Sequence, residues 1–200
     1  MKASYRGPVI SMGNTKLGKI MNISLPPVIS CGSFAPCRIK GCYARKLYAL
    51  GPSVKDAWNH NLMLAITDHH YYFGCILAKV MPATGYFRWH VSGDILNQHY
   101  LEGMQGVAYN APHVKFMCFT KMYHLDYDGI PRNLKIILSA WPGHPLPPRP
   151  KRGFPFPVAY MQDGEEDRIP ASAIECSGKC DTCMKCWELR RGQSVWFHKH

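Results

Sequence analysis

The sequence has no long apolar segment and no acidic residue among its first 55 positions. Its longest apolar stretches, such as residues 73–78 and 136–140, are much shorter than the roughly 20 residues that a helix needs to cross a bilayer. No apolar signal segment opens the chain. We therefore expect a cytoplasmic protein with no membrane partner.

Several catalytic signatures are also missing. There is no phosphate-binding glycine loop, no nucleophile elbow and no His-Glu-x-x-His zinc helix. The motifs thus give no sign of a P-loop enzyme, an α/β-hydrolase or a zinc protease of that type.

The sequence does not indicate a framework of disulfide bonds either, because its nine cysteines are an odd number. An odd count without a secretion signal argues against a disulfide framework and favours thiolates that act as ligands or nucleophiles. The 200 residues, 46% of them hydrophobic, can bury a core without disulfides. We expect a single domain over residues 1–200, with a β/α core at 1–161 and a cysteine-rich C-terminal extension at 162–200 packed on it.

The composition is strongly basic, and the positive charge is unevenly distributed along the chain. The chain has 24 Lys and Arg against 13 Asp and Glu, a net charge of +11. Nine of these cations and no acid lie in residues 1–55. Such a segment is consistent with a solvated basic face, with attraction of an anionic cluster or cofactor, or with contacts to nucleic-acid phosphates. Charge alone does not separate these three alternatives.

Hydrophobic periodicity predicts strands that alternate with helices. The expected strands are Ile20–Leu25, Tyr86–Val91, Val114–Phe119, Leu134–Ser139 and Phe156–Met161, and the expected helices are Tyr43–Leu50, Val54–Ile66, Asp68–Val80 and Asn97–Tyr109. Seven prolines between residues 142 and 157 predict one long ordered loop. Strands separated by helices imply an α/β fold with parallel strands, whose ligand site lies beyond the carboxyl ends of the strands.

Small, polar or charged residues follow the expected strands and are candidates for that ligand site. They are Ser92, Gly93 and Asp94, then Thr120 and Lys121, and finally Ser139. In contrast, the acidic run at residues 165–167 is expected to be a solvated loop.

Four cysteines gather near the C-terminus, at Cys176, Cys180, Cys183 and Cys186. Four thiolates at turn-length spacing can surround one metal ion or one cubane cluster. The two-residue gaps from Cys180 to Cys186 are typical of iron–sulfur loops, whereas zinc sites more often have their cysteine pairs separated by a long insert. We favour iron–sulfur at this group and keep zinc as the alternative.

Three further cysteines, Cys31, Cys37 and Cys42, follow the first expected strand. Three ligands leave one metal position open, which suits a cubane with one substrate-binding iron or a catalytic zinc. His90 or His60 could supply a fourth ligand. The neighbouring arginines and lysines would offset the negative charge of the thiolates.

Several segments resemble the phage "gene product eighty-eight" family. The resemblance is carried by residues 10–18, by Ser24-Leu25-Pro26-Pro27, by residues 35–46, by residues 87–95 and by the terminal cysteine group. It covers most of the chain and implies a viral or prophage origin, with the host-cell cytoplasm as the location, but it supplies no activity.

At a greater distance, the cysteine loop with its Ser-Gly-Asp and Thr-Lys strand ends resembles the partial β/α barrel of radical S-adenosylmethionine proteins. This resemblance implies a 4Fe–4S cluster on Cys31, Cys37 and Cys42, adenine contacts from Tyr43, and an amino-group contact from residues 92–94. Thr120 and Ser139 would lie on the same cofactor-binding rim. The family usually has three and then two residues between its cysteines, whereas this chain has five and four.

Together these observations predict a small partial (β/α) barrel with two iron–sulfur clusters. As an enzyme it would cleave S-adenosylmethionine with electrons from a donor partner, with Lys121 and His90 as candidate catalytic groups at the mouth. The alternative is a non-catalytic nucleic-acid-binding module stabilised by zinc or iron–sulfur, whose basic residues 1–55 contact phosphate.

Overall fold

The computed structural model describes residues 6–39, 41–83, 85–148 and 156–199. The predicted proline-rich loop therefore lies partly outside the described residues, as do Lys2 and Lys40 of the basic segment. No helix in these ranges is long and apolar enough to cross a membrane.

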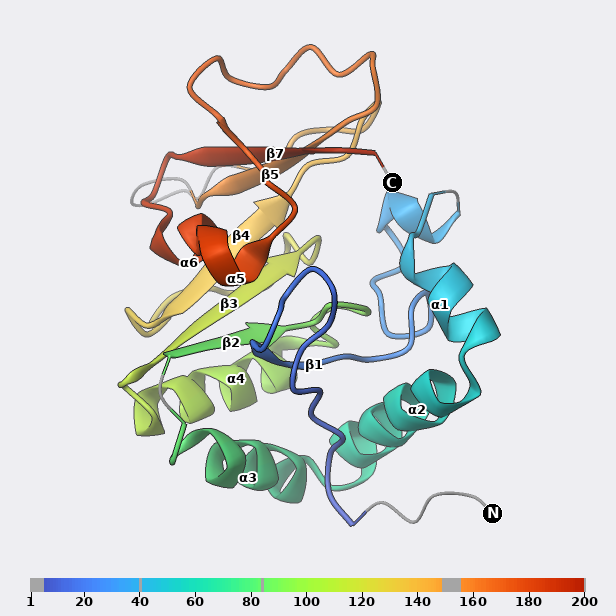
Figure 1. The fold of residues 1–200 in the computed structure, drawn as a ribbon, viewed down its shortest axis with the longest axis vertical. Coiled ribbons are helices and arrows are strands. Elements are labelled where there is room, and N and C mark those ends of the chain that lie inside the picture. Colours follow the sequence, from blue (N-terminus) through green and yellow to red (C-terminus); the bar gives the residue numbers. More distant parts are fainter. Residues whose placement is uncertain (1–5, 40, 84, 149–155, 200) are drawn as a thin grey trace.

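Seven strands form one parallel sheet (Figure 1). They are β1 (Met21–Ile23), β2 (Gly85–Trp89), β3 (Val114–Thr120), β4 (Leu134–Ser139), β5 (Val158–Gln162), β6 (Ile174–Glu175) and β7 (Ser194–His198), in the order β1-β2-β3-β4-β5-β7-β6. Every pair of neighbouring strands is parallel. The sheet is open, with β1 and β6 at its edges.

Six α-helices and one short 3-10 helix occur in the described ranges. They are η1 (Pro36–Arg38), α1 (Ala44–Leu50), α2 (Pro52–Thr67), α3 (His69–Val80), α4 (Gln98–Asn110), α5 (Cys180–Cys183) and α6 (Lys185–Glu188). The side chains of Asp68 and Asn97 cap α3 and α4 by accepting hydrogen bonds from the amides of Tyr71 and Tyr100.

Alternating side chains of the strands build two separate cores. Phe87 and Trp89 of β2 face one side and pack in a large cluster with residues of α3 and α4. Met117 and Ile137 face the other side, where they pack with Trp187 and Leu189. Figure 1 shows α3 and α4 on one side of the sheet, and α5 and α6 on the opposite side near β3.

The predicted α/β class with parallel strands is confirmed. The four predicted N-terminal helices match α1 to α4 within about two residues at each end. The sheet is not closed, so a barrel is not observed, and its description as a partial barrel stays a prediction. Sequence periodicity missed β6 and β7, which place part of residues 162–200 inside the same sheet.

Candidate metal centres

The carboxyl ends of β2 and β3 are joined by the buried carboxylate of Asp94. Its Oδ1 accepts hydrogen bonds from Thr120 Oγ1 at 2.6 Å and from the Ile95 amide at 2.8 Å. Its Oδ2 accepts one from the Lys121 amide at 2.9 Å. The structure thus brings together Asp94, Thr120 and Lys121, which the sequence placed at the ends of two different strands.

Burial raises the pKa of Asp94, and the hydrogen bonds from Thr120 and Lys121 oppose that shift. A carboxylate has about four acceptor positions, and three are in use here. Oδ2 therefore keeps the capacity to accept one more hydrogen bond from a ligand.

The two residues before Asp94 make a tight turn with one unsatisfied group. Gly93 has a φ of +81°, and a Cβ there would lie 2.5 Å from Ser30 Oγ and 2.7 Å from Leu25 Cβ. Ser92 Oγ is buried and has no hydrogen-bond partner among the described residues. Because buried hydroxyls are usually hydrogen-bonded, this group is a candidate ligand contact.

The N-terminal cysteines lie in the loop between β1 and α1, at the end of the sheet toward which β3 and β4 point (Figure 1). Burial, followed by the charges of Asp94, Cys37 and Cys42, raises the pKa of Cys31 to about 12. Burial also raises the pKa of Cys37, which Lys121 lowers. Cys31 and Cys37 therefore both lie within electrostatic range of Asp94.

Trp141, which follows β4, connects this loop to Lys121. A Cβ at Gly41 would lie 3.2 Å from the Trp141 ring, and Lys121 Nζ lies 5.2 Å from the centre of the same ring. The predicted candidate Lys121 thus stands beside the cysteine loop.

Tyr43 and Ser139 also reach this end of the sheet. Tyr43 precedes α1, its hydroxyl donates a hydrogen bond to the Val91 carbonyl, and 56% of the residue is exposed. Ser139 is buried at the end of β4, where its carbonyl accepts a hydrogen bond from the Tyr123 hydroxyl.

The histidines predicted as ligands or catalytic groups are placed differently. His90 is buried, and its ring centroid lies 5.4 Å from that of Tyr100 on α4. Burial lowers the pKa of His90 to about 3, so the ring is neutral at pH 7. His60 Nε2 lies 3.1 Å from the Gly7 carbonyl. The roles of His60 or His90 as a fourth ligand, and of His90 as a catalytic group, stay predictions.

All four C-terminal cysteines line one small cavity of about 20 Å³. Cys180 and Cys183 lie at the two ends of α5, and Cys186 lies on α6. The amide of Cys176 donates to the Trp196 carbonyl, and that of Cys180 donates to the Lys16 carbonyl, both at 2.8 Å. Backbone hydrogen bonds thus hold this group against β7 and the turn before β1.

Seven cysteines are therefore gathered in two places, but their side chains do not converge on a point. Within the described ranges, no three His, Cys, Asp or Glu side chains are arranged to hold one metal ion.

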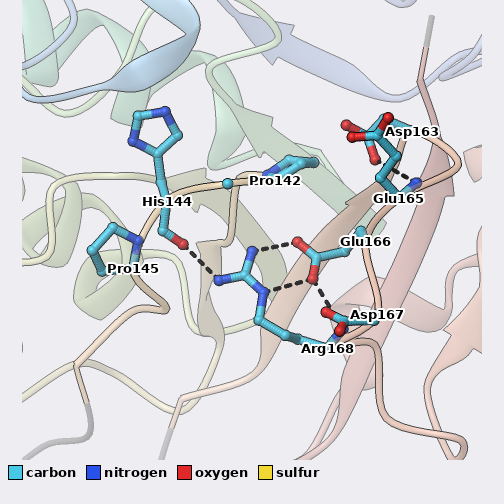
Figure 2. A pocket seen from close by; sticks show the side chains of 9 residues that line it. Pro142, His144, Pro145, Asp163, Glu165, Glu166, Asp167 and Arg168 are labelled. Atoms are coloured by element: carbon cyan, nitrogen blue, oxygen red, sulfur yellow. Dashed lines mark hydrogen bonds and ion pairs between the residues drawn. The ribbon is translucent and has the colours of Figure 1, made fainter.

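Sequence reasoning missed a larger pocket of about 690 Å³ between the segments that follow β4 and β5 (Figure 2). The prediction of a solvated loop at residues 165–167 is wrong for Glu166, which is buried. Its Oε1 accepts a hydrogen bond from Arg168 Nε at 2.6 Å, and Arg168 Nη1 donates to the His144 carbonyl at 2.6 Å. The positions of Glu166 and Arg168 in the sequence did not predict this pair, because the two side chains meet only through the turn that connects them.

Sequence reasoning also missed Arg88, a buried cation in the middle of β2. A usable signal was present: Arg88 stands between aromatic residues in a strand expected to be central, where a charge is rarely buried without a partner.

A family model described as Gene product 88 matches residues 8–189. Comparisons with curated proteins and with solved structures gave no match. The more distant resemblance to radical S-adenosylmethionine proteins thus finds no support in them. The match over nearly the whole chain shows that this protein belongs to the Gene product 88 family.

Proposed function

We propose that this chain is an iron–sulfur protein with one cluster on Cys31, Cys37 and Cys42 and a second on the four C-terminal cysteines. The observation that carries the proposal is the common cavity that all four C-terminal cysteines line. Four thiols around one hollow have few structural uses other than metal binding, since a buried thiol otherwise behaves as a small apolar side chain.

A zinc ion and a cubane cluster require different distances between the thiolate sulfurs. Zinc binds each thiolate sulfur at about 2.3 Å, so the sulfurs around one zinc ion nearly touch one another. No three ligand side chains in the described part of the chain converge in this way. In a cubane each thiolate binds a different iron, which keeps the sulfurs further apart. Zinc stays the alternative at the C-terminal group, because a cavity of about 20 Å³ has room for about one water-sized particle.

The N-terminal group is the candidate for catalysis. Cys31, Cys37 and Cys42 would hold its cluster and leave one iron without a thiolate ligand, and Asp94 and Lys121 are polar groups at the same end of the sheet. Two groups there are suited to a small polar cofactor such as S-adenosylmethionine: the unpartnered Ser92 Oγ and the remaining acceptor position of Asp94 Oδ2. Tyr43, a half-exposed residue next to Cys42, would flank the adenine. When bound, the cluster would supply the electron for reductive cleavage of the cofactor.

The test is anaerobic reconstitution with iron and sulfide, followed by metal analysis. We expect about eight irons per wild-type chain and about four after Cys37→Ala, on the stoichiometry of two cubanes. Cys75→Ala is the matched control, because Cys75 belongs to neither group, and it should keep all the iron. Zinc in place of iron, or an unchanged iron content in Cys37→Ala, would contradict the proposal.

The cofactor step is tested separately by electron paramagnetic resonance of the reduced protein. Added S-adenosylmethionine should perturb the spectrum of wild type and of Cys75→Ala, and should have no effect in Cys37→Ala. An unchanged wild-type spectrum would contradict the cofactor step, and the two clusters would then have no role in the cleavage of S-adenosylmethionine.

The second candidate, a nucleic-acid-binding module, has one observation in its favour. The helix α1 exposes Arg45 and Lys46, in a segment without acids. Exposed Leu47 and Leu50 interrupt this basic surface. The candidate predicts single-strand binding that weakens steeply as salt rises, and a salt-insensitive interaction or none would count against it.

A further inference from the structure

The short helix α1 leaves apolar and basic side chains uncovered at the margin of the molecule (Figure 1). Of its seven residues only Ala44 is buried. Leu47 and Leu50 are 54% and 72% exposed, and their three-residue spacing places them on one side of the helix. Arg45 and Lys46 are also exposed. Because a helix of a globular protein normally turns its apolar side chains toward the core, this side of α1 is suited to contact another molecule.

The same surface continues into the loop that precedes α1. Arg45 Nη1 donates a hydrogen bond to the Arg38 carbonyl at 3.4 Å, and the next residue, Ile39, is 86% exposed. Neither Arg45 nor Lys46 forms an ion pair with a described residue, and the first 55 residues contain no acid. A partner with carboxylates beside apolar side chains would complement these groups. We define the α1 surface as the exposed side chains of Ile39, Arg45, Lys46, Leu47 and Leu50.

The pocket between the segments after β4 and β5 has the opposite charge, and we call it the acidic pocket. Four acids occur within residues 163–167, and all four line this cavity of about 690 Å³. Arg168 pairs with the buried Glu166, whereas the other three acids form no ion pair with a described residue. The chain has 24 basic and 13 acidic residues, so this is an unusual concentration of negative charge for it.

The acidic pocket is held in shape by Arg168 and is partly apolar. Arg168 Nη1 donates to the His144 carbonyl and its Nε to Glu166 Oε1, both at 2.6 Å, so that Arg168 connects the two sides of the pocket (Figure 2). Pro145 lines the pocket, and the next residue, Leu146, is 43% exposed. Carboxylates beside apolar side chains are the chemistry that the α1 surface requires.

Both surfaces adjoin the segment that follows β4. A Cβ at Gly41, three residues before α1, would lie 3.2 Å from the Trp141 ring. The Trp141 carbonyl accepts a hydrogen bond at 3.2 Å from Nη2 of Arg168, which lines the acidic pocket. The basic and the acidic surface therefore lie near the same edge of the sheet.

We propose that the α1 surface of one molecule docks in the acidic pocket of a second copy of this chain. An acidic partner of another kind would match the α1 surface alone, and a small cation would match only the pocket, whereas a second copy uses both. The net charge of +11 opposes association at long range, but such repulsion is screened beyond about 8 Å at physiological salt. A two-fold dimer, with α1 of each molecule in the pocket of the other, is the simplest closed form of this contact.

Analytical ultracentrifugation of the full chain tests the contact. Wild type should convert from monomer to dimer as its concentration rises. The variant Arg45→Glu/Lys46→Glu should stay monomeric, and so should Glu165→Lys/Asp167→Lys, because each places like charges on the two sides of the contact.

Mixing these two variants separates a lost contact from a lost fold. An equimolar mixture should form a heterodimer, since both of its contacts again join opposite charges, whereas misfolded chains would not recover on mixing. Lys19→Glu/Lys79→Glu is the matched control, because it changes the net charge as much as Arg45→Glu/Lys46→Glu does, at exposed lysines outside both surfaces. This control should dimerise as wild type does.

Leu50→Ser tests the apolar part of the contact without changing the charge. It should weaken dimerisation about ten-fold, and it should leave the stability of the monomer unchanged, because the side chain is exposed. Ile66→Ser on α2 is its control, since Ile66 is 65% exposed and lies outside the α1 surface. It should alter neither property.

Three results would overturn the inference: a wild type that is still monomeric at about 100 µM, a mixture of the two charge-reversed variants that does not associate, or a Lys19→Glu/Lys79→Glu protein that fails to dimerise. A monomer that binds single-stranded DNA only when Arg45 and Lys46 are intact would also overturn it, because α1 would then contact phosphate. The inference goes beyond the proposed function, and none of these measurements depends on whether the chain holds iron.

Discussion

At the end of β2, Gly93 is required by both its backbone conformation and its surroundings. Its φ of +81° disfavours any side chain, and a Cβ would press against Ser30 and Leu25. The turn it makes delivers Asp94 to the ends of β2 and β3. The whole Ser-Gly-Asp segment therefore depends on a residue without a side chain.

Replacement of Gly93 by alanine should consequently destabilise the fold. We expect a loss of about 3 kcal/mol or more in the free energy of unfolding, from the left-handed backbone together with overpacking. Urea denaturation provides the measurement. Gly192→Ala is the control, because Gly192 has the same φ of +81° and nothing near its Cβ position; its cost should be about 1–2 kcal/mol. Equal losses in the two variants would mean that crowding at Gly93 contributes nothing.

The Glu166–Arg168 pair should make stability depend on pH. The hydrogen bonds from Arg168 lower the pKa of Glu166 below its ordinary value of 4.5. The stabilisation is therefore fully present above pH 4.5 and is lost as the pH falls through the lowered pKa. At pH 7, Glu166→Gln should be less stable than wild type by about 1–2 kcal/mol.

Thermal unfolding of wild type and Glu166→Gln between about pH 3 and pH 7 checks this dependence. The difference between the two proteins should shrink toward the acid end. Glu188→Gln, which removes an exposed ion pair with Lys115, should show little change at any pH. A Glu166→Gln deficit that is constant with pH would assign the effect to packing rather than to charge.

Among the elements, α6 is attached to the sheet chiefly by one side chain. Trp187 is 4% exposed, its Nε1 donates a hydrogen bond to the Phe87 carbonyl at 3.2 Å, and its ring lies edge-on to Tyr86. Because Cys186 precedes Trp187, this anchor also fixes one side of the C-terminal cysteine cavity.

Removal of the anchor should affect both stability and metal binding. Trp187→Ala should cost about 3–5 kcal/mol and weaken metal retention at the C-terminal group. Trp187→Phe keeps much of the packing and should cost about 1 kcal/mol, the value of the lost hydrogen bond. Chemical denaturation and metal analysis of the two variants measure these effects. A Trp187→Ala protein of wild-type stability would show that α6 is held by other contacts.

Most of the elements that sequence periodicity predicted correctly have long, regular patterns. Each of α2, α3 and α4 spans at least three turns, and β3 and β4 are mostly buried apolar runs of seven and six residues. The two-residue β6 and the four-residue α5 and α6 are too short to show a period. β7 has an apolar pattern, but its place between β5 and β6 arises from non-local pairing.

At the scale of the whole molecule, the sequence by itself determined the α/β class, the two cysteine groups and the polar residues at the strand ends. These features depend on local spacing: apolar periodicity specifies helices and strands, and short gaps keep cysteines together. The helix α4 connects β2 and β3 and makes them parallel, so Asp94, Thr120 and Lys121 were expected at one edge.

The tertiary structure alone decided which distant groups meet. Side-chain burial depends on packing between strands, and so Glu166, His90 and Arg88 acquired environments that their sequence neighbours do not reveal. Strand pairing placed Arg88 on the same face of the sheet as Cys180 and Cys186, which lie far from it along the chain. The number of cysteines is thus a property of the sequence, whereas the charge that they face is a property of the fold.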